Sequence, residues 1–352
     1  MINRKESGNI YCSSTIDLFK LIASILVVFL HANSTGNNAF FNLFSFAVTP
    51  MAVPFFFIIS GFFFNQGLMK ANDKRHYFLT YEKKLLILYL LWSVVSLPFS
   101  IITYGQLYVG KSFWYIFFVI IRRYVLCGEG VFWYILVMAE SAVVLYLVSK
   151  FKQKWLLLAL IVIGLFLGVL YDNGSMIHNS FISKMNSYFY FFFSWSNNFI
   201  MKGIPFMGIG YIIYIFIVCV PQKGWIISAV LFLVTTLFNV VIYYLNYRIM
   251  VLFIIQAVAM SLFAMKFETK IDKYKSLILR ELSSSIYFLH TFFLYFLIEV
   301  IFGTELFIPL KVLLAVLLCS IVYLIVKFVL SRHDLILLKI MFNIKSGKLL
   351  KK

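Results

Sequence analysis

Long apolar runs, each about as long as a membrane-spanning helix, recur along most of the chain. A spanning helix needs about 20 mostly apolar residues, because lipid leaves backbone groups no partner outside the helix itself. Continuous runs of this kind exclude the alternating pattern of a membrane barrel. The sequence therefore predicts an all-α polytopic membrane helix bundle with about ten transmembrane helices, near 16–34, 46–65, 85–103, 131–149, 155–171, 203–220, 224–244, 248–265, 284–302 and 311–330.

The basic residues predict the orientation of this bundle. Cytoplasmic loops of membrane proteins are enriched in Lys and Arg, and most of the 31 basic residues fall in cytoplasmic segments if the N-terminus is inside. We therefore expect both termini in the cytoplasm, with an N-terminal segment at 1–15, a transmembrane domain at 16–330 and a basic tail at 331–352. The first run is not a cleaved signal peptide on this interpretation, because Asp17 and Lys20 interrupt its start.

Composition agrees with lipid as the main solvent. The chain has 352 residues, of which 63% are hydrophobic and 12% charged, too few polar side chains to cover a soluble surface. The net charge of +18 does not indicate nucleic acid, since the basic residues are spread along the cytoplasmic edge, where they attract anionic membrane lipid. The four cysteines lie far apart and predict neither a metal site nor a disulfide framework.

Ionisable residues recur in the first apolar run, where each is costly in lipid and therefore a candidate for function. Asp17 can pair with Lys20 one turn later. Lys20 and His31 lie on one helix face, about three turns and roughly 16 Å apart along the axis. The structural alternative for Asp17 and Lys20 is snorkelling to the inner interface, and for His31 an interfacial position at a helix end.

A second polar group follows the apolar segment 112–125, which we interpret as an interfacial or re-entrant helix on the outer side. Arg122 and Arg123 end this segment, and Glu129 follows them. Two adjacent guanidiniums suit a phosphate, carboxylate or carbonyl oxygen of a ligand. A salt bridge to Glu129 or to lipid phosphate is the alternative.

A third candidate is His290, inside the ninth predicted helix and preceded by serines at 283–285. A histidine at that depth more often faces the bundle than lipid. It is either catalytic or simply hydrogen-bonded, and its spacing does not decide between these roles. Glu140 and Glu299 are single carboxylates in otherwise apolar helices and rank below the histidines.

Several segments resemble, in order, those of the membrane-bound acyltransferase family 3, which includes polysaccharide O-acetyltransferases. The opening helix of that family has a basic residue followed eleven positions later by a histidine, as Lys20 and His31 are here. Arginine is more usual than lysine at the first of these positions, and Ser60 and Gly61 match the second helix. The segments that carry the resemblance are IDLFKLIASILVVFLHA, VPFFFIISGFFF, YEKKLLILYLLW, FWYILVM, GIPFMGIGYIIY and SIYFLHTFF.

The resemblance implies an integral membrane O-acyltransferase of the bacterial plasma membrane. It would transfer an acetyl group, rather than an aminoacyl group, from cytoplasmic acetyl-CoA to a hydroxyl of a cell-surface or lipid-linked glycan. Acetyl-CoA would be a substrate, with no bound cofactor and no metal. His31 and Lys20 are the expected catalytic residues, His31 as the base or a transient acyl carrier. Donor or acceptor binding is expected from Asp17, Arg122, Arg123, Glu129, Ser60 and His290.

A membrane transporter of a serine-like amino acid or of a glycan is the alternative, because some membrane domains of this family are attached to serine racemases. Helices broken by Gly or Pro in two matching halves would favour transport, and the sequence has none that we detect. The shared face of Lys20 and His31 favours acyl transfer. A purely structural membrane subunit is the third interpretation, which the intramembrane histidines and arginines disfavour.

Overall fold

The computed structural model describes residues 14–32, 38–172, 184, 187–188, 197–245, 249–303 and 306–344. These residues are helical apart from short connections and contain no strand, which confirms the all-α fold. Eight helical segments among them are long and apolar enough to cross a membrane: Ser14–Ala32, Ala39–Lys70, Lys74–Leu107, Phe113–Phe151, Lys154–Tyr171, Phe199–Cys219, Gly224–Tyr244 and Ile308–Arg332.

The eighth and ninth predicted spans are also helical but differ from expectation. Helix α11 (Met250–Lys266) is apolar and has 17 residues. The ninth span belongs to a longer helical run made of α12 (Lys273–Phe293), the π-turn η7 (Leu294–Ile298) and α13 (Glu299–Phe302). This run starts well before residue 284, because the Asp272 side chain caps α12 by accepting the Lys275 N–H at 2.9 Å. That hydrogen bond holds the pKa of the Asp272 carboxyl below its usual value.

The predicted orientation and the single transmembrane domain at 16–330 stay predictions. Residues 1–13 of the predicted N-terminal segment and 345–352 of the predicted tail lie outside the described residues. The helices form two compact units, one made of residues 1–56 and 219–329 and the other of 57–218 and 330–352.

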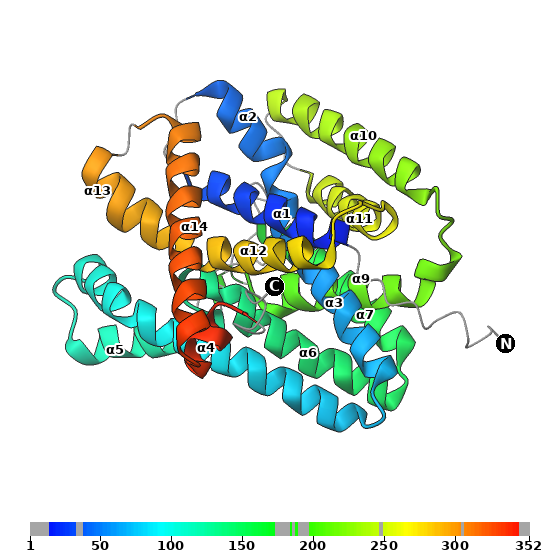
Figure 1. Cartoon of the computed structure of the whole chain (residues 1–352), viewed down its shortest axis with the longest axis horizontal. Helices are drawn as coiled ribbons and strands as arrows, with labels where there is room; N and C mark the ends of the chain where they lie inside the picture. The colour runs from blue at the N-terminus through cyan, green and yellow to red at the C-terminus, as the bar shows by residue number, and fades with distance from the viewer. Residues whose placement is uncertain are drawn as a thin grey trace. The chain divides into compact units, whose positions relative to one another are not determined.

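The first unit contains α1 (Ser14–Ala32), α2 (Ala39–Ala47), α10 (Gly224–Tyr244), α11, α12 and most of α14 (Ile308–Arg332). Helix α1 lies along α12, and α10 lies along α11 (Figure 1). Apolar faces of α1, α12 and α14 form one buried cluster, which includes Val28, Ala32, Ile286, Leu294, Ala315 and Cys319. This cluster fixes how α1 meets α12, and therefore which polar side chains of the two helices face each other.

Helices α1 and α12 run in the same direction. Asp17 near the start of α1 contacts Arg280, the Lys20 carbonyl accepts the Ser283 hydroxyl at 2.9 Å, and His31 contacts a residue of η7, which continues α12. The contacts thus advance together along both helices. This direction agrees with the prediction that the first and ninth spans start on the same side of the membrane.

The second unit contains most of α3 (Ala52–Lys70), then α4 (Lys74–Leu107), α5 (Phe113–Arg122), α6 (Trp133–Phe151), α7 (Lys154–Asp172), most of α9 (Ile204–Phe216) and α15 (Ile336–Met341). Helices α3 and α9 cross with their backbones in contact. A Cβ atom added at Gly61 would lie 2.0 Å from the Met207 carbonyl oxygen, and one at Gly210 would lie 1.9 Å from that of Ile58. Glycine is required at both positions because any side chain would push the helices apart.

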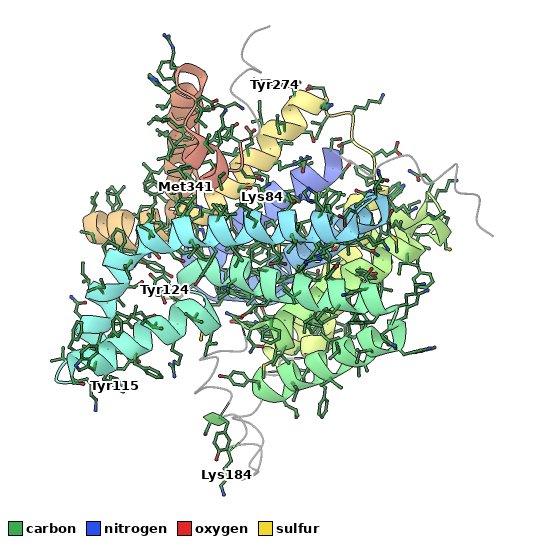
Figure 2. All side chains as sticks on the ribbon, turned by 90° about the horizontal axis from the view of Figure 1, so that it is seen from below. Lys84, Tyr115, Tyr124, Lys184, Tyr274 and Met341 are labelled. Atoms are coloured by element: carbon green, nitrogen blue, oxygen red, sulfur yellow. The ribbon has the colours of Figure 1, made fainter. Side chains whose placement is uncertain are left out.

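The chain near the C-terminus returns to α4, as Figure 2 shows for Lys84 and Met341. The Lys84 ammonium donates to the Asn343 side-chain oxygen at 3.3 Å, and the Trp92 indole N–H donates to the Met341 carbonyl at 3.2 Å. The predicted helix at 112–125 is confirmed as α5 followed by the π-turn η3 (Arg123–Cys127). Its location at the outer interface stays a prediction.

Candidate active site

The buried carboxylate of Asp17 organises a cluster of charges near the start of α1. It accepts hydrogen bonds from the Ser276 hydroxyl at 2.7 Å and from Nε and Nη2 of Arg280 at 3.0 and 2.7 Å. The Lys20 ammonium lies 3.8 Å from the same carboxylate, which confirms the predicted pairing. Asp17 therefore holds Ser276, Arg280 and Lys20 around one carboxylate, and donor or acceptor binding by Asp17 stays a prediction.

This cluster carries a net positive charge, because two cations surround one carboxylate. Asp17 is 2% exposed, while the side chains of Arg280 and Lys20 are 27% and 21% exposed. The Arg280 guanidinium donates to the Asp17 carboxylate through two of its nitrogens, Nε and Nη2, in the side-by-side geometry that suits a carboxylate. Arg280 thus brings a planar guanidinium from α12 to the same carboxylate that Lys20 contacts from α1.

A second cluster lies toward the other end of α1. The rings of His31 and His290 have centroids 5.1 Å apart and planes inclined at 46°. The Tyr295 hydroxyl lies 3.4 Å from Nδ1 of His31. His290 is fully buried. Two histidines that the sequence presents as separate candidates are thus adjacent side chains of one site.

Within α12, His290 is held by its own backbone. Its Nδ1 lies 2.8 Å from the Tyr287 carbonyl oxygen and 3.1 Å from that of Ile286. Its Nε2 is buried and has no hydrogen-bond partner among the residues that the structure describes. One ring nitrogen of His290, Nδ1, therefore contacts the backbone of α12, and the other, Nε2, does not.

Two further ion pairs involve residues of α12, α13 and α14. The Glu281 carboxylate, 1% exposed, accepts from the Lys327 ammonium at 3.0 Å and from the Tyr323 hydroxyl at 2.9 Å. The Lys311 ammonium lies 3.8 Å from the carboxylate of Glu299. Glu299 therefore has a cationic partner on α14, which favours a structural role for this carboxylate.

Four of the predicted ligand-binding residues belong to the second unit. Both carboxylate oxygens of Glu129 accept the Tyr104 hydroxyl, at 3.0 and 2.8 Å, and the Arg123 guanidinium lies over the Tyr104 ring, 5.4 Å from its centroid. The Ser60 hydroxyl is 2.9 Å from the hydroxyl of Tyr134. Arg122 ends α5. Donor or acceptor binding by Arg122, Arg123, Glu129 and Ser60 stays a prediction.

Sequence reasoning missed Arg280 and Tyr295. Arg280 counts as a cytoplasmic loop charge when only local hydropathy is considered, and Tyr295 lies among apolar residues. The available signal was the group of charged and polar residues in the first half of α12, which continue in the same helix to His290. Among the described residues, no group of three or more His, Cys, Asp and Glu side chains could hold a metal ion.

Comparison with known proteins adds one finding. The model of a family described as an acyltransferase domain matches residues 14–332, which is most of the chain. No curated protein and no solved structure matches.

Proposed function

The chain belongs to the membrane-bound acyltransferase family 3, and we propose that this membrane acyltransferase moves an acetyl group from cytoplasmic acetyl-CoA to a hydroxyl of a cell-surface or lipid-linked glycan. The product would be an O-acetyl ester, and the location would be the bacterial plasma membrane. The family assignment and the polar side chains of α1 and α12 together support this proposal.

One observation carries the proposal: the paired helices α1 and α12 hold a cationic cluster at one end and two histidines at the other. Acetyl-CoA likewise has its charged and its reactive groups at opposite ends, because its phosphopantetheine arm separates the phosphates from the thioester. Arg280 and Lys20 would bind the phosphates. His31, roughly 16 Å further along α1, would act at the thioester and the acceptor hydroxyl.

The chemistry requires a base at the histidine end. A sugar hydroxyl is a weak nucleophile at neutral pH, and an imidazole can remove its proton as the oxygen attacks the thioester carbon. The tetrahedral intermediate then collapses with loss of the CoA thiolate. A transient acyl group on His31 is the variant in which the imidazole itself attacks first.

The test uses purified protein in lipid nanodiscs with acetyl-CoA labelled in its acetyl group and a panel of surface glycans. Wild-type protein should transfer label, and His31→Ala should lower the rate at least about 100-fold, the order that a general base contributes. His76→Ala is the matched control, since His76 is exposed and should leave transfer unchanged.

The opposite result has a defined form. If the wild type neither binds nor cleaves the CoA thioester, while labelled serine or a lipid-linked saccharide crosses proteoliposomes, the proposed transfer is wrong. The protein would then work as a transporter.

A further inference from the structure

A buried tyrosine of the second unit lies between two charged side chains. The Tyr104 hydroxyl donates to both carboxylate oxygens of Glu129, at 3.0 and 2.8 Å. The Arg123 guanidinium lies over the face of the same ring, 5.4 Å from its centroid. Tyr104 is 5% exposed, so it is part of the protein interior and holds a carboxylate at its hydroxyl and a cation on its face.

The protein itself leaves both charges short of hydrogen-bond partners. The structure gives the Arg123 guanidinium no hydrogen bond among the described residues, and its Nε atom is buried. A buried donor without an acceptor is costly, so an outside molecule is expected to supply one. Within the same residues, the Glu129 carboxylate accepts only from Tyr104, although a carboxylate has about four lone-pair sites.

The opposite charges of this pair select the chemistry of the missing partner. A phosphate or carboxylate would be attracted by Arg123 and repelled by Glu129, and a cation would meet the reverse. A hydroxyl group suits both side chains, because it donates its hydrogen to the carboxylate while its oxygen accepts from the guanidinium. A neutral saccharide has several hydroxyls at fixed spacing and can therefore bind both side chains at once.

The backbone on both sides of this pair is held in place. Tyr124 is bound to α4, because its hydroxyl lies 3.0 and 2.9 Å from the hydroxyls of Ser96 and Ser100 (Tyr124 is labelled in Figure 2). Glu129 follows Gly128, whose φ of +72° lies in the region that favours glycine. Side chains on a fixed backbone lose little conformational freedom when a ligand binds.

We propose that Arg123 and Glu129 bind the hydroxyls of an uncharged saccharide, which makes this part of the second unit the binding site of the acceptor glycan. The inference rests on the proposed function for the role of the saccharide as acceptor. Arg123 donates to sugar oxygens, Glu129 accepts from sugar hydroxyls, and Tyr104 is the positioning residue for both. The predicted location of segment 112–125 on the outer side agrees with a glycan of the cell surface.

The test measures glycan binding without acetyl-CoA, so that binding is separated from transfer. Labelled nanodiscs that contain the purified protein are applied to immobilised oligosaccharides, some built of glucose or N-acetylglucosamine and others carrying glucuronic acid or phosphate. The wild type should bind the neutral set more tightly. Glu129→Gln should weaken binding of the neutral set about 10-fold, the order that one hydrogen bond to a charged group contributes.

The same variant should bind the acidic set more tightly than the wild type does, because the repelling carboxylate is gone. Arg123→Gln should weaken binding of both sets. Lys111→Gln is the matched control: Lys111 is exposed and also lies over a tyrosine ring, 5.9 Å from the centroid of Tyr115, and its loss should leave the preference for neutral glycans unchanged.

Three results would overturn the proposal. They are a wild type that binds no neutral glycan, a Glu129→Gln variant that binds neutral glycans as well as the wild type does, and a loss of neutral and acidic binding together in that variant while it stays folded. Equilibrium unfolding of each variant in mixed micelles shows whether it is folded.

A measurement on the wild type covers a variant that does not fold. Carbodiimide labelling of carboxylates, read by mass spectrometry, should be slowed at least about 10-fold at Glu129 by a saturating neutral glycan and should be unchanged at the exposed Glu268. Equal labelling of Glu129 with and without the glycan would refute the site.

The outcomes also separate this site from the proposed function. A wild type that binds neutral glycans through Glu129 but transfers no acetyl group would count against the proposed function and leave the saccharide site in place. Acetyl transfer to a glycan at the same rate in Glu129→Gln as in the wild type would leave the function in place and refute the site.

Discussion

Removing the charge of Arg280 should destabilise the protein more than removing the charge of its partner Asp17. The reason is the difference in burial: the side chain of Asp17 is 2% exposed and that of Arg280 is 27% exposed. Arg280→Met keeps an aliphatic stem but leaves a buried carboxylate without its closest cation. Asp17→Asn leaves a guanidinium that can turn toward solvent, and the amide oxygen still accepts the Ser276 hydroxyl.

The magnitudes follow from these environments. Breaking a buried ion pair by removing one partner costs about 3–5 kcal/mol. Arg280→Met should fall at the lower end, about 3 kcal/mol, because Ser276 at 2.7 Å and Lys20 at 3.8 Å still contact Asp17. Asp17→Asn should cost about 2 kcal/mol, within the range of about 1.5–3 kcal/mol for hydrogen bonds to a charged group. The double variant should be more stable than Arg280→Met alone, since no charge is left buried.

The free energy of unfolding would be measured for the wild type, the two single variants and the double variant. The assay is equilibrium unfolding in mixed micelles of dodecyl maltoside and SDS, followed by tryptophan fluorescence. Lys275→Met is the matched control, because its partner Asp272 is exposed on the same helix and the pair should contribute under about 1 kcal/mol. If Asp17→Asn proved as costly as Arg280→Met, or if the two costs simply added, the assignment of Asp17 as the buried and dependent partner would be wrong.

Two further predictions concern packing and a second buried ion pair. Gly210→Ala places a methyl group 1.9 Å from the Ile58 carbonyl oxygen and should lower stability by about 3 kcal/mol. Gly105→Ala, in open space on α4, should instead raise stability by up to about 1 kcal/mol. Thermal shift in detergent measures both variants, and equal shifts would contradict the close helix crossing. Lys327→Met removes the cationic partner of the buried Glu281 carboxylate and should lower the free energy of unfolding by about 3 kcal/mol. Adding Glu281→Gln should recover part of this stability, as measured by equilibrium unfolding in mixed micelles.

Local sequence was sufficient to predict most of the helices, because hydropathy over a window of about 20 residues reports burial in lipid directly. It failed at the start of α12, where Arg280 and Glu281 are typical of a loop. Their charges are tolerated in a helix because Asp17 from α1 and Lys327 from α14 neutralise them. Such pairing depends on tertiary neighbours, which no window along the chain contains.

The same distinction applies to the candidate site. Asp17, Lys20 and His31 could be grouped from the sequence because a helix repeats every 3.6 residues and all three lie on α1. Arg280 and Tyr295 could not be added, since their proximity depends on the register of α12 against α1. Apolar packing of Val28 and Ala32 against Ile286 and Leu294 sets that register, and many apolar sequences would allow a different one.

The parallel direction of α1 and α12 connects topology to chemistry. With the N-terminus in the cytoplasm, as the basic residues predict, both helices start at the cytoplasmic side, and the cluster of Asp17, Lys20 and Arg280 lies there with them. The histidine pair then lies in the outer half of the membrane. If the two helices ran antiparallel, the residues that contact Asp17 would lie at the end of α12 and those that contact His31 would lie at its start. On the proposed function, parallel packing would let one helix pair receive a phosphorylated donor from the cytoplasm and present a base to an acceptor on the far side.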